Sequence, residues 1–173
     1  MFSRLLSKGL KRISINSKKS HIFLKNTDFS LVIVRPYDLV QLGDFVGSGS
    51  EDILIWTGKT IGRTLCNNIR QNKRIKNRKK LFDALMDNLE NLGYGNCDID
   101  YKKGKSAKLE ISNSLIEEID DLTDAELIKN LYNGIIIGAF NSAGLEVDQI
   151  GEVKLEKNKP IVFEYNIEEV EEF

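Results

Sequence analysis

Apolar residues recur at helical spacing in two stretches of the first half of the chain. One stretch predicts a helix from about residue 49 to 70, because the capping-box pattern Ser48-x-x-Glu51 stands directly before its apolar residues. The other covers residues 78–92 and is followed by Gly93, which suits a left-handed helix cap. Both stretches predict amphipathic helices.

The same spacing returns after a second capping-box pattern, Thr123-x-x-Glu126, and continues to Gly144. Near the start of the chain, the apolar and β-branched stretch Phe29–Arg35 predicts a strand. Pro36 follows it at a position typical of the first turn of a helix. We therefore expect a strand followed by a helix there, and a further long helix from about residue 123.

Alternating apolar and polar residues predict strands in two other regions. Residues 97–101 and 107–111 alternate on either side of a glycine-containing turn. Residues 145–156 and 161–167 also alternate, and residues 157–160 between them suit a hairpin turn. Because helices and hairpins occur in blocks, the chain is predicted to be α+β, with an antiparallel sheet of two hairpins packed against long helices.

Charge divides the chain into three parts. Residues 1–27 hold seven Lys/Arg and no acid, with apolar residues from Phe2 to Leu10 spaced for a short helix. This basic arm is predicted either to dock on a partner or to pack on its own domain or a second copy. Residues 28–167 form the expected domain, and residues 168–173 form an acidic tail.

The formal net charge is only −1, but its distribution is uneven. Residues 1–109 hold 21 Lys/Arg and 10 Asp/Glu, whereas residues 110–173 hold 4 and 16. Such asymmetry steers charged partners or favours head-to-tail association unless folding interleaves the two halves.

The cysteine content and the apolar runs bear on location. Cys66 and Cys97 are too few for a disulfide scaffold, and no hydrophobic leader is evident. The longest apolar run, Leu131 to Phe140, is about half the ~20 residues that a membrane-spanning helix needs. We expect a cytoplasmic protein without a transmembrane segment.

Two predicted helices each place two glycines within an apolar seam. Each glycine inside a helix costs about 0.5–1 kcal/mol relative to alanine, so something must approach these backbones closely. Either the two helices cross at their glycines, or a narrow apolar cavity rimmed by Trp56 and Phe140 admits a hydrophobic ligand. The candidate ligand-binding residues are Ile55, Trp56, Gly58, Gly62, Leu131, Gly134, Gly138 and Phe140.

Catalytic and metal sites find little support in the residues. The single histidine, His21, lies in a polar stretch, and no nucleophile or phosphate-binding motif accompanies it. With Cys66 and Cys97 it makes at most three soft ligands, one too few for a closed zinc site. The basic cluster Arg70–Lys80 is interpreted as a solvated junction rather than a nucleic-acid site. We predict no catalytic residue, no metal and no identifiable cofactor.

Several motifs together resemble the 4-vinyl reductase domain family. They are Leu31-Val-Ile-Val-Arg-Pro-Tyr-Asp-Leu39, Ile53-Leu-Ile-Trp-Thr-Gly-Lys-Thr-Ile-Gly-Arg-Thr-Leu65, Leu109-Glu-Ile-Ser-Asn-Ser114, Leu131-Tyr-Asn-Gly-Ile-Ile-Ile-Gly-Ala139 and the hairpin from Glu152 to Tyr165. They occur in the family's order and cover about residues 29–167. The resemblance implies an α/β sandwich like that of small TRAPP subunits and heme-NO-binding-like domains, an apolar tunnel, and dimerisation through long helices.

One departure limits what the resemblance implies. Many family members carry two cysteines in the final hairpin, near the positions of Leu155 and of Val162 or Phe163 here. Because this chain has neither cysteine, a thiol-based metal or redox role is not implied.

Three functional hypotheses follow. The first is a sensor or carrier that binds a hydrophobic or hydrocarbon-like small molecule, as a homodimer. The second is a structural or scaffolding dimer whose glycines serve helix packing and whose basic arm docks a protein partner. The third is a reductase component acting on a tetrapyrrole vinyl group, which rests on the family name alone.

Overall fold

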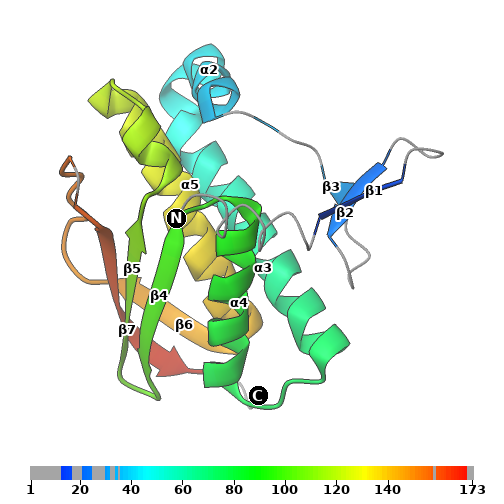
Figure 1. The fold of residues 1–173 in the computed structure, drawn as a ribbon. Coiled ribbons are helices and arrows are strands. Elements are labelled where there is room, and N and C mark those ends of the chain that lie inside the picture. Colours follow the sequence, from blue (N-terminus) through cyan, green and yellow to red (C-terminus); the bar gives the residue numbers. More distant parts are fainter. Residues whose placement is uncertain are drawn as a thin grey trace.

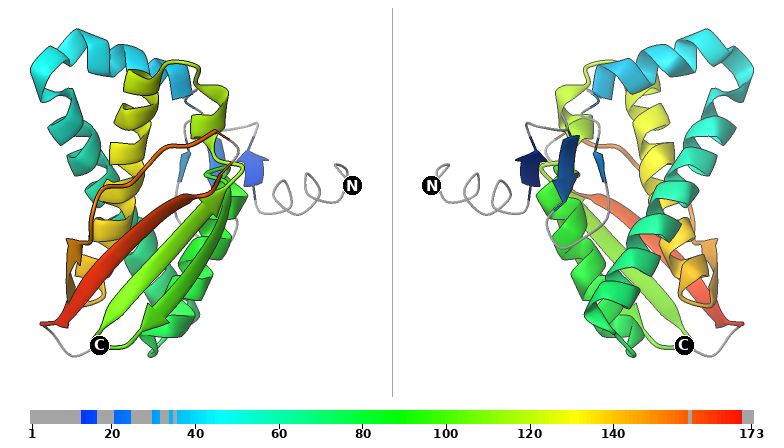
Figure 2. Two further views of the ribbon diagram at one scale, coloured as in Figure 1. Left: turned by 90° about the vertical axis from the view of Figure 1, so that its left-hand side faces the viewer. Right: turned by 90° about the vertical axis from the view of Figure 1, so that its right-hand side faces the viewer.

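The computed structural model describes residues 13–16, 21–24, 30–31, 34, 36–157 and 159–170. Its larger sheet is antiparallel, with the strand order β4 (Asn96–Lys102), β5 (Ser106–Ser112), β7 (Ile161–Glu169) and β6 (Leu145–Gln149). The four α-helices of the described residues lie on one side of this sheet, and the left view of Figure 2 shows the opposite side facing the viewer. The fold is therefore α+β, as the sequence predicts.

Four helices follow the predicted patterns closely (Figure 1). They are α2 (Pro36–Val46), α3 (Ser50–Lys73), α4 (Arg78–Leu92) and α5 (Leu122–Ser142). Gly93 caps α4 in the left-handed conformation, with φ of 91°. The sequence pattern thus identified α3, α4 and α5 within about three residues of their ends, whereas for α2 it predicted only a start near Pro36.

Both predicted capping boxes at the α-helices are wrong. Ser48 lies in a short 3-10 helix, η1 (Gly47–Gly49), and α3 begins after Gly49 without a side-chain cap. At α5 the cap is Asp121, whose carboxylate accepts hydrogen bonds from the amides of Thr123 (2.8 Å) and Asp124 (3.3 Å). An aspartate is as good a cap as threonine, so the helix begins before Thr123.

The first predicted hairpin is confirmed. It consists of β4 (Asn96–Lys102) and β5 (Ser106–Ser112), which pair with Cys97 opposite Ile111. The second hairpin, β6 (Leu145–Gln149) and β7 (Ile161–Glu169), is also antiparallel, but β6 is shorter than the predicted strand 145–156. Gly151, with φ of 69°, turns the chain out of the ladder directly after the amide of Ile150 bonds the carbonyl of Glu164.

A smaller antiparallel sheet precedes the helices. Its strands are β1 (Ile13–Asn16), β2 (His21–Leu24) and β3 (Ser30–Leu31). The strand predicted over Phe29–Arg35 is seen only at β3, and its remainder lies largely outside the described residues. The helix predicted between Phe2 and Leu10 lies wholly outside them. The sequence pattern did not predict β1 and β2, and the β2–β3 pairing joins the two sides of the predicted boundary at residue 27.

A buried arginine joins three elements at one end of the domain. Arg78, at the start of α4, is only 9% exposed, and its Nε donates to the carbonyl of Ala143 at the end of α5 (2.9 Å). Its Nη1 forms an ion pair with Glu169 at the end of β7 (2.8 Å). Arg78 therefore holds the ends of two helices and a strand together.

Helices α3 and α5 cross in direct backbone contact. A Cβ atom added at Gly58 would lie 2.2 Å from the carbonyl oxygen of Leu131, and one at Gly62 would lie 1.9 Å from that of Ile135. The contact is reciprocal, because a Cβ atom at Gly134 or Gly138 would lie 2.3 or 2.1 Å from a carbonyl oxygen of α3. All four distances are shorter than any real carbon–oxygen contact. The crossing supplies the close approach that the four glycines predict.

This geometry makes Gly62 intolerant of a single methyl group. In Gly62→Ala the two helices must separate, so we expect the free energy of unfolding to fall by about 3 kcal/mol or more, as in severe overpacking. Urea denaturation followed by far-ultraviolet circular dichroism measures the change. Gly49→Ala is the matched control, since its nearest contact, Val46, would be an ordinary 3.5 Å away. Equal midpoints for the two variants would contradict the crossing.

Candidate ligand-binding cavity

The eight predicted ligand-binding residues do not surround one space. Gly58, Gly62, Gly134 and Gly138 face the backbone of the opposite helix, and Leu131 is buried at the same crossing. Ile55 is half-buried, with its carbonyl oxygen against Gly134. Trp56 is 69% exposed, whereas Phe140 is 2% exposed in the core. The predicted rim residues, Trp56 and Phe140, therefore lie in different environments.

A small cavity lies elsewhere, between α4, α5 and the inner face of the sheet. Its volume is about 10 Å³, roughly that of one water-sized sphere. Every lining residue is apolar: Phe82, Leu85, Met86, Leu89, Ile99, Leu109, Ile135, Ile136, Ala139 and Phe140. Of the predicted site residues, only Phe140 lines it.

Sequence reasoning missed most of this lining as a site. The apolar residues of the helix predicted over 78–92 include Phe82, Leu85, Met86 and Leu89, and the alternating strands predicted over 97–101 and 107–111 include Ile99 and Leu109. These patterns predict which side chains are buried, but they do not predict where the packing between buried faces leaves a cavity. Only the packing of α4 and α5 on the strands brings these residues around one space.

Aromatic rings connect the cavity with the centre of the sheet. Phe82 contacts Phe140 edge to face, with centroids 4.6 Å apart, and it also contacts Tyr101 (5.1 Å). Phe140 in turn lies 6.0 Å from Tyr165 of β7, which stacks on Phe163 (6.5 Å). Such contacts add about 0.5–1.5 kcal/mol per pair beyond burial. One wall of the cavity is thus part of a continuous aromatic cluster.

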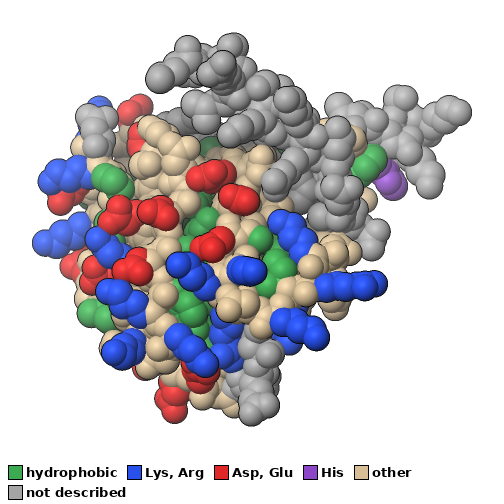
Figure 3. Space-filling view, turned by 60° about the horizontal axis from the view of Figure 1, so that its bottom comes forward, with side chains coloured by type: hydrophobic (Ala, Val, Ile, Leu, Met, Phe, Trp, Pro, Cys, Tyr) green, Lys and Arg blue, Asp and Glu red, His purple; other side chains and the backbone are tan. Residues whose placement is uncertain are grey.

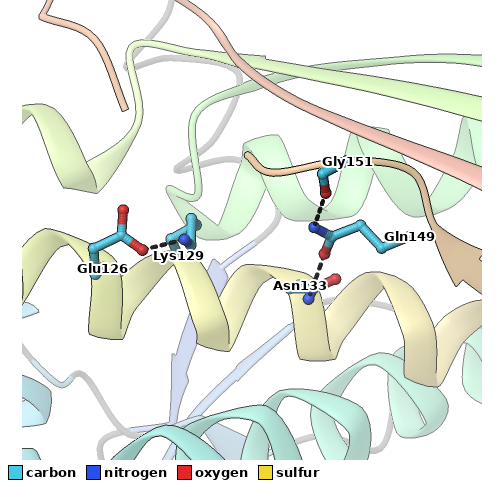
Figure 4. A network of polar contacts seen from close by, with 5 residues as sticks. All are labelled: Glu126, Lys129, Asn133, Gln149 and Gly151. Carbon is cyan, nitrogen blue, oxygen red and sulfur yellow. Dashed lines mark hydrogen bonds and ion pairs between the residues drawn. The ribbon is translucent and has the colours of Figure 1, made fainter. Parts of the chain in front are cut away.

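Tyr165 begins a chain of hydrogen bonds that leads to the surface. Its hydroxyl donates to Oδ1 of Asn133 (2.6 Å), and Nδ2 of Asn133 donates to Oε1 of Gln149 (2.9 Å). Nε2 of Gln149 then donates to the carbonyl of Gly151 (2.9 Å), as Figure 4 shows. Burial raises the pKa of Tyr165, so this hydroxyl stays a donor. The chain links the core to the segment that follows β6.

Both cysteines lie in the core and are free. Burial raises the pKa of the Cys66 thiol, while a hydrogen bond with Ser142 and the charge of Arg70 act in the opposite direction. Burial and the nearby Glu90 carboxylate raise the pKa of the Cys97 thiol to about 12. Raised pKa values disfavour the thiolate, which is the nucleophilic and metal-binding form. These surroundings suit packing rather than chemistry at the sulfur atoms.

The basic cluster of the sequence lies at the end of the molecule seen in Figure 3, where Lys and Arg side chains gather. Arg78 is buried and donates a hydrogen bond to Ala143. The exposed members of the cluster are Lys73, Arg74, Lys76, Lys79 and Lys80. The tip of the β4–β5 hairpin, with Lys102, Lys103 and Lys105, is brought here because Gly104 approaches Glu169, the partner of Arg78. Folding therefore brings further basic residues to this surface, together with the acidic Glu168 and Glu169 at the end of β7.

The residues that the structure describes contain neither a metal-binding cluster nor a membrane-spanning helix. In that part of the chain, His, Cys, Asp and Glu side chains nowhere gather in a group of three or more that suits a metal ion. The helices seen there are also too short or too polar to cross a membrane.

Comparison by sequence identifies no relative: no protein family and no curated protein matches this chain. The resemblance to 4-vinyl reductase domains therefore stays a prediction.

Solved structures share the fold at low identity. The phenol-responsive sensory domain of the transcription activator PoxR, solved with phenol, has a TM-score of 0.65 and 10% identity, over 96% of this chain and 90% of its own. A trafficking protein particle complex subunit 3 from Naegleria fowleri, covalently bound to palmitic acid, has a TM-score of 0.58 and 13% identity, over 78% and 92%. An unliganded Fe(II) H-NOX protein from K. algicida has a TM-score of 0.55 and 12% identity, over 96% and 87%. The predicted TRAPP-like and heme-NO-binding-like fold is confirmed.

The raised thiol pKa predicts how stability depends on alkaline pH. In the unfolded chain Cys97 ionises near its ordinary pKa of 9.0, whereas in the folded chain it stays protonated to about 12. The stabilising contribution is therefore complete below about pH 9 and is lost as pH rises toward about 12, at up to about 1.4 kcal/mol per pH unit. Urea titrations at about pH 8, 9 and 10 measure this slope. Cys97→Ala should have a shallower slope; an unchanged slope would contradict the assignment.

Proposed function

We propose that this domain binds a small apolar molecule between α4, α5 and the sheet, and acts as a sensor or carrier of that molecule. The observation that carries the proposal is the wholly apolar cavity, because a space with no polar lining group stays dry and favours an apolar occupant. Neighbours of the same fold support it: the PoxR domain was solved with phenol, and the trafficking subunit with palmitic acid.

The size of the cavity restricts the ligand class. A volume of about 10 Å³ is too small for any organic molecule, so binding requires side chains of the lining to move. Met86 has a flexible, unbranched side chain, and Phe82 and Phe140 present aromatic rings to an entering molecule. A small aromatic or short hydrocarbon-like ligand fits these properties better than a long acyl chain, which needs a much wider opening.

The lining of the cavity and the two cysteines bear on the other functional predictions. The apolar lining holds no proton donor or nucleophile, so the cavity gives no support to reduction of a tetrapyrrole vinyl group. Membership of the 4-vinyl reductase family rests on the motif resemblance. The free, buried cysteines agree with a reducing compartment, which supports the prediction of a cytoplasmic protein.

Enlarging the cavity tests the proposal. Leu89→Ala should lower the free energy of unfolding by about 2–5 kcal/mol and should increase the stabilisation that toluene gives, because the new space accepts the ligand without side-chain movement. Thermal unfolding with and without toluene, phenol and hexane measures both effects.

Leu127→Ala is the matched control, since Leu127 is 8% exposed on α5 but lies against Gly43, away from the cavity. It should lose stability without gaining a larger response to toluene. Equal responses of the two variants, or no response of either, would exclude the cavity as the binding site.

A second candidate function, the scaffolding homodimer, is favoured by exposed apolar side chains on two consecutive helices. Ile53 and Trp56 are 40% and 69% exposed and lie one turn apart on α3. Leu42 and Phe45 are 46% and 90% exposed on α2. Exposed aromatic residues of this kind are typical anchors of protein interfaces. A homodimer through this surface is compatible with ligand binding on the other side of α5.

Trp56 is the residue to change in order to test the dimer. Sedimentation velocity should give a dimer for the unaltered protein and a monomer for Trp56→Glu, because a charge at the centre of an apolar contact is costly to bury. Val170→Glu, which alters an apolar residue that is 48% exposed near the end of β7, should remain a dimer. A monomeric unaltered protein would rule out this function.

A further inference from the structure

A groove of about 450 Å³ lies on the face of the sheet opposite to the helices. Its floor includes Glu110 of β5 with Val162 and Glu164 of β7. These residues alternate with the buried Leu109, Ile161 and Phe163, whose side chains point to the core, so the floor belongs to the outer face. Residues 150–156, between β6 and β7, form the other wall, and Lys159 and Pro160 line the groove just before β7 begins. The groove is therefore separated from the apolar cavity by the sheet.

The groove is negatively charged. Four carboxylates line it, those of Glu110, Glu152, Glu156 and Glu164, against the two ammonium groups of Lys154 and Lys159, which leaves two negative charges in excess. Glu110 pairs with Lys108 (2.6 Å), and Glu156 pairs with Lys159. Within the described part of the chain, Glu152 and Glu164 form no ion pair. The Glu152 carboxylate is therefore free to receive a cation from outside, whereas the Glu164 carboxylate shares the positive charge of Lys108, which lies opposite it on β5 and pairs with Glu110.

The wall of the groove has the shape of a strand without a partner. Val153 is 5% exposed and Leu155 is half-buried, whereas Glu152, Lys154 and Glu156 are exposed and line the groove. This alternation is that of an extended chain. Among the described residues, however, the backbone of residues 152–155 forms no hydrogen bond with another segment. An extended segment with unpaired amides and carbonyls favours pairing with another extended chain.

The wall is nevertheless held in place at its beginning. The amide of Ile150 donates to the carbonyl of Glu164 (2.7 Å), and the side chain of Gln149 holds the carbonyl of Gly151 (Figure 4). Val153 then anchors the segment in the core. The groove is thus formed before any partner arrives, which lowers the entropic cost of binding.

From these features we infer that the groove docks an extended peptide segment of a partner protein, with Lys or Arg at alternate positions. The alternate basic side chains meet the carboxylates of Glu152 and Glu164, and the intervening side chains lie against the apolar surface of Ile150 and Val162. A wall of about seven residues spans roughly 20 Å in extended form, the length of a short peptide rather than of a small cation. This site is independent of the apolar cavity and of its ligand.

The inference is tested with the full chain and a fluorescein-labelled ten-residue peptide of alternating Lys and Thr. Fluorescence anisotropy should show binding at about 50 mM salt that weakens at about 300 mM, because exposed ion pairs are screened. Glu152→Lys with Glu164→Lys should weaken binding about tenfold or more, since two attractive contacts become repulsive. A peptide of alternating Glu and Thr should not bind.

A matched control separates the groove from total charge. Asp83→Lys with Asp87→Lys makes the same change of net charge at exposed positions on α4, on the other side of the sheet, and should leave binding within about twofold. Circular dichroism and urea midpoints establish that both double variants are folded. No binding by the unaltered chain, equal losses in the two variants, or equal binding of the acidic peptide would each overturn the inference.

Discussion

The contact between α3 and α5 at four glycines is the constraint on which the arrangement of the other elements depends. Each glycine lies against a carbonyl oxygen or backbone of the opposite helix, so the interaxial distance admits no side chain between them. With α5 fixed against α3, the opposite face of α5 is left to cover the sheet, and α4 packs beside it (Figures 1 and 2). The cavity lies where α4, α5 and the strands meet, at a place where three surfaces have to fit together.

Much of the fold is readable from the sequence because burial is periodic. The face of α4 and the inward residues of β4 and β5 follow periods of 3.6 and 2 with few interruptions, and these elements were predicted within a few residues. The ends of elements were less predictable. Several Asp, Ser and Thr residues compete to cap α3 and α5, and the alternation of residues 145–156 continues beyond the point at which Gly151 ends the pairing of β6.

The candidate site was predicted less well, for a related physical reason. The glycines within the two apolar seams correctly indicated that something approaches the helix backbones closely. The same glycine spacing, however, suits either a ligand or a second helix. Trp56 and Phe140 are both large and aromatic, and nothing local distinguishes an exposed ring from one that lines a cavity. The cavity is a small packing defect between elements whose buried faces were predicted correctly. It depends on packing between elements, which no local pattern encodes.

The cavity and the groove lie on opposite faces of the sheet, but one series of contacts connects them. If the cavity takes up an organic ligand as proposed, the filled and empty forms must differ in the packing of its lining, which includes Phe140, because the cavity is far smaller than such a ligand. Phe140 contacts Tyr165, and the hydroxyl of Tyr165 holds Asn133, which holds Gln149 and through it Gly151. Gly151 lies between two residues of the groove wall, Ile150 and Glu152.

This series of contacts does not by itself couple the cavity to the groove. Coupling requires that the Tyr165 side chain have two positions, only one of which keeps the hydrogen bond to Asn133. Tyr165 is therefore the residue at which a ligand in the core and a partner on the outer face would act on the same hydrogen bond.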